Sequence, residues 1–380
     1  MKATLRTVRL ALAEPLRISR STMAARDAVW LTVEHEGLHG HGEAVTSVYY
    51  GLDTATLEGR LYESGRELSR FPDPESALRE WSSDTPQSGT RQAGTRQPGE
   101  RRSGERPPAV TAAVEAALLD LCGRRAGAPV YRLLRADSDA GSATDAGAGG
   151  APSARTARTI GIVPAPHAAA QARALVAAGF GLLKAKAGTP DPEDDLDRIR
   201  AIRAAAPHAR LLLDPNGAWT SDQARQLIPR FAELGVEAVE QPVAPGDPEA
   251  LARLAERSPL PLIADEDAVG HEDVRRLAGR VHGVNVKLAK CGGPRAALRI
   301  AELIAGSGTE LMLGCLTAST LGLAPAVHLA DRARWADLDG HLLLADDPWT
   351  GIGGADGIVR ASDLPGLGVR EKRAGEAGGP

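Results

Sequence analysis

From residue 157 onward, short β-rich apolar runs alternate with helical segments rich in Ala, Leu and Arg. We predict eight strands, at Thr159–Val163, Gly181–Ala187, Arg210–Asp214, Ala238–Gln241, Leu260–Asp265, Gly283–Leu288, Glu310–Gly314 and Trp335–Leu338. We predict seven helices between them, at Pro166–Ala178, Pro192–Ala206, Ser221–Leu234, Pro248–Arg257, His271–Ala278, Pro294–Gly306 and Ser319–Asp331. Strand–helix units that recur about every 25 residues favour a closed parallel barrel. An open doubly wound sheet is the alternative, but the segment after the first strand, GIVPAPHA, lacks a glycine-rich phosphate turn.

The remaining residues divide the chain around this barrel, which we place at 155–345. Residues 1–135 form an N-terminal unit with strands at Ala3–Leu12 and Val29–Glu34, a turn region at His35–Gly42, and helices at Thr54–Phe71 and Val110–Arg124. Residues 82–108 are polar and rich in Gly, Pro and Arg, which indicates a flexible insertion. Residues 136–154 resemble a flexible linker, and 346–380 form a C-terminal segment.

Charge and composition exclude several classes of protein. The net charge of −4 and the pI near 6.2 provide no basic field, so we expect no nucleic-acid partner. No run of about 20 apolar residues is present, so we expect no membrane span. Charged residues interrupt the N-terminus where a signal peptide would be apolar, and three cysteines form no paired framework. We therefore expect a reduced, cytoplasmic protein.

Lysine is rare, because only six of the 45 Lys and Arg residues are lysine. Four of them, Lys184, Lys186, Lys287 and Lys290, lie in two short hydrophobic segments. Lysine differs from arginine mainly in that it can lose its proton, so lysines kept within strands are candidate bases. Chance placement is the other interpretation. We assign no role to Lys290 from the sequence.

Charged residues lie at or near the end of almost every predicted strand. They are Lys184 and Lys186, Asp214, Glu240, Asp265, Lys287, and the pair Asp337 and Asp339. The carboxyl ends of barrel strands form one face, which is where barrel enzymes hold their active sites. Structural salt bridges would not recur at the same point of so many consecutive units, although any single member could be structural.

The residue types indicate a metal site with two bases. Asp214, Glu240 and Asp265 supply one carboxylate each from three adjacent strands, a set of hard oxygen ligands suited to Mg²⁺. Lys186 and Lys287 lie on strands four positions apart, so they face each other across an eight-stranded barrel. Two opposed bases can remove a proton from one face of a carbon beside a carboxylate and return it to the other, with Mg²⁺ stabilising the enediolate.

Two further pairs share a strand face. Lys184 is two residues from Lys186, and this neighbouring charge should lower the pKa of Lys186. Asp337 and Asp339 are also two residues apart, and their carboxylates would suit a substrate ammonium group. A salt bridge that closes the barrel, or a loop cap, is the alternative for this pair.

At this point the chain resembles the enolase superfamily, in particular its muconate-lactonizing-enzyme subgroup. The resemblance rests on LLKAKAG, LLLDPNGAW, VEQPV, IADED, VNVKLAKCGG and DLDG, together with HGHGEA and EAALLDLCGRRAGAPVYRLL before the barrel. It implies a modified (β/α)₇β TIM barrel under an α+β capping domain, which is built from the N-terminal part and the C-terminal tail. It also implies Lys186 and Lys287 as the bases, Lys184 as the partner of Lys186, and the three carboxylates as Mg²⁺ ligands.

Within that subgroup, the DxD of the last strand resembles the one in dipeptide epimerases, where it holds the substrate ammonium. The resemblance thus implies a Mg²⁺-dependent enzyme that inverts a dipeptide at the α-carbon next to its carboxylate. We also expect a homo-oligomer. The alternatives are an N-succinylamino acid racemase, an o-succinylbenzoate synthase or a muconate cycloisomerase of the same subgroup. A catalytically silent metal-binding relative is the non-enzyme alternative.

Overall fold

The computed structural model describes residues 1–83, 106–138 and 150–373 of the chain. Most of the predicted insertion at 82–108 and of the predicted linker at 136–154 therefore lies outside the described residues. No helix in the described part is both long and apolar enough to cross a membrane.

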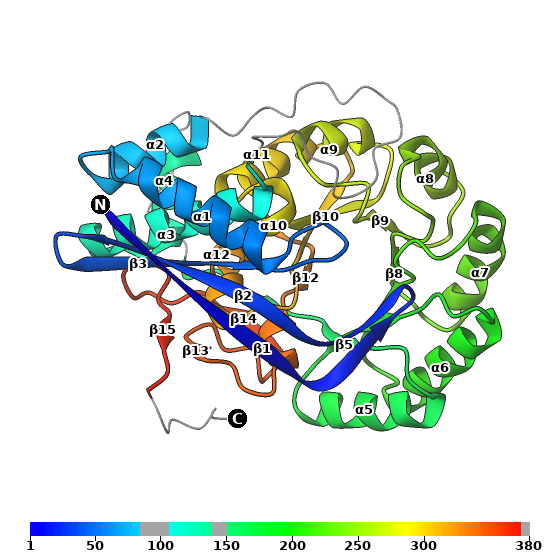
Figure 1. Ribbon diagram of the computed structural model, residues 1–380. Helices are drawn as coiled ribbons and strands as arrows, with labels where there is room; N and C mark the ends of the chain where they lie inside the picture. The colour runs from blue at the N-terminus through cyan, green and yellow to red at the C-terminus, as the bar shows by residue number, and fades with distance from the viewer. Residues whose placement is uncertain (84–105, 139–149, 374–380) are drawn as a thin grey trace.

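Eight parallel strands form the predicted barrel (Figure 1). They are β5 (Arg158–Ile160), β6 (Leu182–Lys186), β7 (Arg210–Asp214), β8 (Ala238–Glu240), β9 (Leu262–Ala264), β10 (Gly283–Lys287), β11 (Glu310–Gly314) and β12 (Trp335–Asp337). They neighbour one another in sequence order from β5 to β12. Thr156, just before β5, bridges to Ala336 of β12, and Ala157 N donates to Ala336 O at 2.7 Å. These contacts join the two edges of the sheet, so the expectation of a closed barrel is confirmed.

Helices surround the barrel (Figure 1). They are α5 (Ala165–Ala177), α6 (Pro192–Ala205), α7 (Ser221–Glu233), α8 (Pro248–Ala255), α9 (His271–Leu277), the short α10 (Leu288–Cys291), α11 (Pro294–Ile304) and α12 (Thr320–Val327). Local sequence fixes several starts: Asp191 and Asp247 are N-caps whose carboxylates accept from backbone N–H groups, and each is followed by a proline. Proline suits this position because its missing N–H has no partner there.

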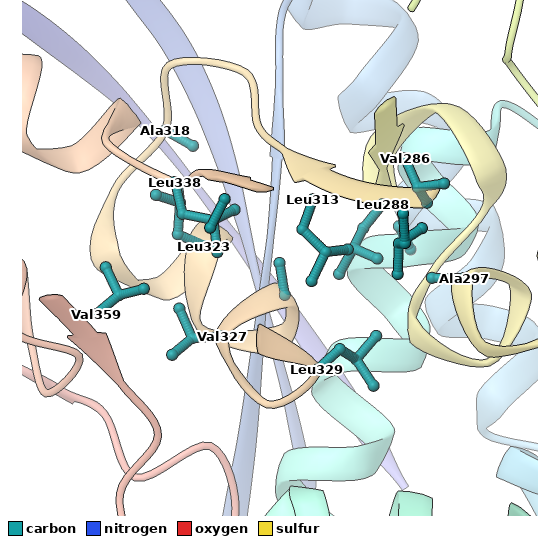
Figure 2. Packing of buried hydrophobic residues seen from close by; sticks show 14 of the residues in the cluster. Val286, Leu288, Ala297, Leu313, Ala318, Leu323, Val327, Leu329, Leu338 and Val359 are labelled. Atoms are coloured by element: carbon teal, nitrogen blue, oxygen red, sulfur yellow. The ribbon is translucent and has the colours of Figure 1, made fainter. Parts of the chain in front are cut away.

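Outward-facing strand residues pack against these helices. Figure 2 shows Val286 of β10 and Leu313 of β11 among buried aliphatic side chains that include Ala297 of α11 and Leu323 of α12. Burial of such side chains contributes about 25 cal/mol per Å². Because side chains alternate along a strand, the residues between them point into the barrel.

The barrel interior has an apolar floor below a charged layer. The floor is one buried cluster of Ala157, Leu182, Leu212, Ala238, Ile263, Met312 and Trp335. Two residues beyond five of these floor residues, the same alternation brings Lys184, Asp214, Glu240, Asp265 and Asp337 to the interior. These charged side chains therefore lie at the carboxyl end of the barrel, above the apolar cluster.

The N-terminal unit is an antiparallel sheet covered by helices. Its elements are β1 (Lys2–Ile18), β2 (Ser21–His35), β3 (Leu38–Val45), α1 (Thr54–Leu68), α2 (Pro74–Ser83), α3 (Pro108–Ala126) and α4 (Val130–Ser138). Figure 1 shows the β1–β2 hairpin running from these helices to the barrel, where Ile162 N donates to Arg17 O at 2.8 Å.

The prediction of a turn region at His35–Gly42 was wrong. The turn comprises Glu36 and Gly37, with φ of 52° and 79°, and β3 resumes at Leu38. The glycines that resemble a turn serve close packing, since a Cβ on Gly42 would lie 2.0 Å from Ala113 O of α3. Glycine in a strand allows this close approach of another backbone.

The C-terminal segment contacts both units. It contains β13 (Trp349–Thr350), β14 (Ile358–Arg360) and β15 (Arg370–Glu371), and β14 pairs with β4 (Ser153–Arg155) just before the barrel. Trp349 lies edge-on to Trp30 of β2, with ring centroids 5.5 Å apart.

Candidate active site

The predicted charged residues gather in one network at the carboxyl end of the barrel. Lys184 is its centre and is 1% exposed. Its Nζ lies 3.2 Å from Asp214 Oδ2, 2.6 Å from Glu240 Oε2 and 2.7 Å from Asp337 Oδ2. Three surrounding carboxylates hold the pKa of Lys184 well above its ordinary value despite burial, which acts in the opposite direction. Lys184 is therefore a fixed cation that compensates charge from three strands.

Lys186 and Lys287 occupy opposite sides of this network. Lys186 Nζ lies 2.5 Å from Asp214 Oδ2, and Lys287 Nζ lies 2.7 Å from Asp265 Oδ2. Their strands, β6 and β10, are four positions apart in the eight-stranded sheet, with β7, β8 and β9 between them. The two amines thus face a common space from opposite walls, with the three carboxylates along the arc that joins them.

Lys290 also belongs to this network, although sequence reasoning left it without a role. It projects from α10, and its buried Nζ donates to Asp265 Oδ1 at 2.5 Å, Asp265 O at 2.6 Å and Asn285 O at 2.9 Å. It thereby fixes the orientation of Asp265 and leaves Oδ2 facing Lys287. Lys287 and Lys290 lower the pKa of Asp265 well below its usual range, against the effect of burial.

The three carboxylates differ in their environment. Burial opposes ionisation of Asp214, but Lys186 and Lys184 lower its pKa to about 2. Burial, together with the charges of Asp214 and Asp265, raises the pKa of Glu240 to about 7. Asn285 Nδ2 donates to Glu240 Oε1 at 2.8 Å, whereas the buried Oε2 makes an ion pair but no hydrogen bond. The Lys184 ammonium, 2.6 Å from Oε2, compensates the charge of this buried carboxylate.

The three carboxylates do not converge on a common point in this structure. Within residues 1–83, 106–138 and 150–373, no three His, Cys, Asp or Glu side chains gather as a group that could hold a metal. Each of the three carboxylates instead contacts a lysine ammonium group. The donor set still fits a hard divalent cation, because it consists of three buried carboxylates, one from each of three adjacent strands.

Asp337 and Asp339 differ in the number of hydrogen bonds that their carboxylate oxygens accept. Asp337 Oδ2 contacts Lys184, but its buried Oδ1 has no hydrogen-bond partner. Asp339 accepts from Thr159 N at 2.7 Å and Thr159 Oγ1 at 3.3 Å, and it pairs with Arg158 at 3.2 Å. Asp337 therefore retains a free acceptor in the barrel, while Asp339 also ties the first strand to the last.

The N-terminal unit supplies side chains near the mouth of the barrel. Arg20, at the turn between β1 and β2, pairs with Glu266 at 2.8 Å and donates to Asn216 O at 3.1 Å. Its guanidinium lies over the Tyr49 ring, 4.2 Å from the centroid. Burial and the charge of Asp265 raise the pKa of Tyr50 well above its ordinary value. These contacts place the loop that follows β3 next to the charged network.

Sequence reasoning missed Asn285 and the pairing of Arg20 with Glu266. Asn285 lies between Gly283 and Lys287 on the inward face of β10, so strand alternation was a usable signal for it. Glu266 follows Asp265 at the end of a predicted strand and Arg20 lies in the first loop, but their pairing depends on how the N-terminal hairpin reaches the barrel.

Comparison with known proteins supports a common origin. The family described as Enolase C-terminal domain-like matches residues 167–374. The chain is 32% identical to the hydrophobic dipeptide epimerase of Roseobacter litoralis, over 97% of this chain and 98% of that protein. It is 29% identical to the L-Ala-D/L-amino acid epimerase of Flavobacterium johnsoniae, over 97% and 99% of the two chains. Among solved structures, the Enterococcus faecalis dipeptide epimerase complexed with Mg and L-Leu-L-Tyr superposes with a TM-score of 0.83 at 30% identity, covering 97% and 98%.

Proposed function

The chain belongs to the Enolase C-terminal domain-like family, it is an isomerase, and we propose that it epimerises a dipeptide at the α-carbon next to the carboxylate. The observation that carries the proposal is the pair of lysines, Lys186 and Lys287, on opposite walls of one charged network. The dipeptide epimerases similar to this chain support the choice of substrate.

We propose Asp214, Glu240 and Asp265 as the ligands of a Mg²⁺ ion. Their chemistry suits that ion, and the structure of the Enterococcus faecalis relative contains Mg. When bound, the ion would supply positive charge that stabilises the electron-rich form of the substrate carboxylate. Lys290 orients one of these ligands, Asp265, through its side-chain and backbone oxygens.

Lys186 and Lys287 would exchange the α-proton from opposite faces of the substrate. One lysine, in its neutral form, removes the proton, and the other, protonated, returns one to the opposite face of the planar enediolate. The Asp265 charge raises the pKa of Lys287, so this lysine is held protonated while the pair persists. To act as a base, it must therefore first give up its carboxylate contact. Lys184 stays protonated among its three carboxylates and acts by compensating charge.

Asp337 would bind the ammonium group of the dipeptide, with Asp339 beside it. The free Oδ1 of Asp337 is a buried acceptor on β12, across the barrel from the carboxylates of β7 to β9. A dipeptide whose carboxylate lies at the proposed Mg²⁺ ligands therefore extends its amino end toward Asp337. Substrates without an ammonium group would leave Asp337 Oδ1 unsatisfied, which costs about 1–3 kcal/mol.

A library of dipeptides incubated with the Mg²⁺-loaded enzyme in D₂O tests the proposal. We expect a mass gain of one unit together with inversion at the C-terminal α-carbon. If N-succinylamino acids exchange and no dipeptide does, the racemase alternative replaces the proposal. If no compound of either class exchanges, the chain is not an epimerase of this kind.

A further inference from the structure

Arg26 of the N-terminal sheet forms no ion pair with the described residues. Arg26 of β2 donates from Nη1 to Thr46 O at 2.9 Å, while Nε and Nη2 lie 3.4 and 3.3 Å from Met23 Sδ. Among the described residues no carboxylate forms an ion pair with it. Arg20, by contrast, is paired with Glu266 at 2.8 Å.

The surroundings of Arg26 make this lack of a counterion costly. Burial lowers the pKa of Arg26 to about 10, and the ionisable groups that oppose this shift are Cys315 and Tyr50. Both are neutral at pH 7, because burial raises the pKa of each above its ordinary value. Thioether sulfur is a weak acceptor, so two of the three guanidinium nitrogens lack a strong partner. A desolvated cation of this kind is stabilised by an anion.

Arg26 lies on the face of the sheet that meets the barrel. Side chains alternate along β2, so Arg26 shares a face with Trp30. The indole of Trp30 donates to Glu43, and Glu43 accepts from Ser319 in the loop after β11. Cys315 begins that loop directly after β11. Arg26 contacts Thr46, and the adjacent Val45 lines one cavity with Lys287 and Cys315, so the guanidinium lies near the β11 side of the barrel mouth.

This position is opposite the proposed metal ligands. Strands β7 to β9 carry the three carboxylates, and β11 and β12 lie on the other side of the barrel. A substrate whose carboxylate lies at β7 to β9 therefore brings its far end toward β11 and β12. There Asp337 offers an acceptor to the ammonium group, and Arg26 offers Nε and Nη2, which now donate to the weakly accepting Met23 thioether, to a neighbouring anionic group.

We propose that Arg26 binds a carboxylate at the far end of the substrate, so that the preferred dipeptides begin with Asp or Glu. The inference rests on the proposed function and adds the class of the N-terminal residue. A charge-assisted hydrogen bond from a desolvated guanidinium predicts an advantage of about 10- to 100-fold in kcat/KM over the amide analogue.

The test compares dipeptides that differ only in the first residue, Glu-Leu against Gln-Leu. We expect the wild-type enzyme to favour Glu-Leu by about 10- to 100-fold in kcat/KM, and Arg26→Met to reduce this ratio to near one. Arg9→Met is the matched control, since the Arg9 side chain on β1 is 73% exposed and should leave the ratio intact. A wild-type ratio near one, or a ratio that persists in Arg26→Met, would overturn the inference.

Two further measurements separate this inference from the proposed function. If Arg26→Met does not fold, Arg26→Lys keeps the charge but loses the fork of donors, and a ratio equal to wild type there contradicts the inference. If no dipeptide is turned over, N-succinyl-leucine is the second probe, because its succinyl group also carries a far carboxylate. Racemisation that requires Arg26 would then support anion binding by Arg26 while the dipeptide proposal fails. If wild type and Arg26→Met bind Glu-Leu and N-succinyl-leucine with equal affinity in calorimetry, anion binding by Arg26 is refuted.

Discussion

Replacement of Lys184 by methionine tests whether lysines hold the carboxylate network together. The Nζ of Lys184 lies within 3.2 Å of Asp214, Glu240 and Asp337, and the residue is 1% exposed. Methionine preserves the length of the side chain but removes the charge. Removal of one partner from a buried ion pair costs about 3–5 kcal/mol, because the remaining charge is left uncompensated.

This loss converts to a shift in melting temperature. The unfolding entropy near the transition is about 2.1 cal/mol/K per residue, which for 380 residues is about 0.8 kcal/mol/K. A loss of about 4 kcal/mol therefore lowers Tm by roughly 5 °C. Thermal unfolding followed by circular dichroism, without divalent cations, measures this directly. Lys2→Met is the matched control, since Lys2 is exposed at the start of β1 and should leave Tm unchanged.

The same variant responds differently to Mg²⁺. If Asp214 and Glu240 are ligands of the ion, the cation compensates the charge that Lys184 no longer supplies. Saturating Mg²⁺ should therefore raise Tm more in Lys184→Met than in the wild-type protein. An unchanged Tm in Lys184→Met, or an equal Mg²⁺ effect in the two proteins, would refute this reasoning.

Two further predictions concern the fold around the site. Gly42→Ala should destabilise the protein by about 1–3 kcal/mol, because its Cβ would lie 2.0 Å from Ala113 O. Gly59→Ala is the control, since open space surrounds Gly59, and equal urea midpoints for the two variants would contradict the prediction. His328 accepts from Tyr131 N, and burial lowers its pKa to about 4 from 6.5, so the unfolded chain binds more protons between these values. The free energy of unfolding should therefore fall as pH drops through that window, by at most about 3 kcal/mol. Urea titrations of His328→Gln should show a weaker dependence of this free energy on pH. A pH profile identical to that of wild type would contradict the prediction.

The barrel and its charged face were predictable because the recurring strand–helix units and the charged residues at most strand ends are visible in the sequence. Once β6 pairs with β7, the inward positions of Lys186 and Asp214 follow from a period of two. The partners of those side chains were not predictable. A lysine reaches several carboxylates, and only the packed structure shows that Lys290 binds Asp265.

The N-terminal unit was harder to predict. In HGHGEA the glycines of β3 resemble turn residues, although they are needed because α3 packs directly on the strand. The pairing of Arg20 with Glu266 spans two units, so no local pattern carries it. The boundaries of the units, the metal ligands, the homo-oligomeric state and the cytoplasmic location remain predictions.

Deuterium exchange by single-lysine variants tests the central claim, that Lys186 and Lys287 act on opposite faces of one α-carbon. The substrate is each epimer of a dipeptide that the wild-type enzyme inverts, in D₂O with Mg²⁺. Lys186→Ala and Lys287→Ala should each lose inversion by about 10²- to 10⁴-fold. Each should still exchange the α-proton of one epimer without inverting it, and the epimer should differ between the two variants. Full inversion by either variant, or exchange of the same epimer by both, would contradict the two-base account.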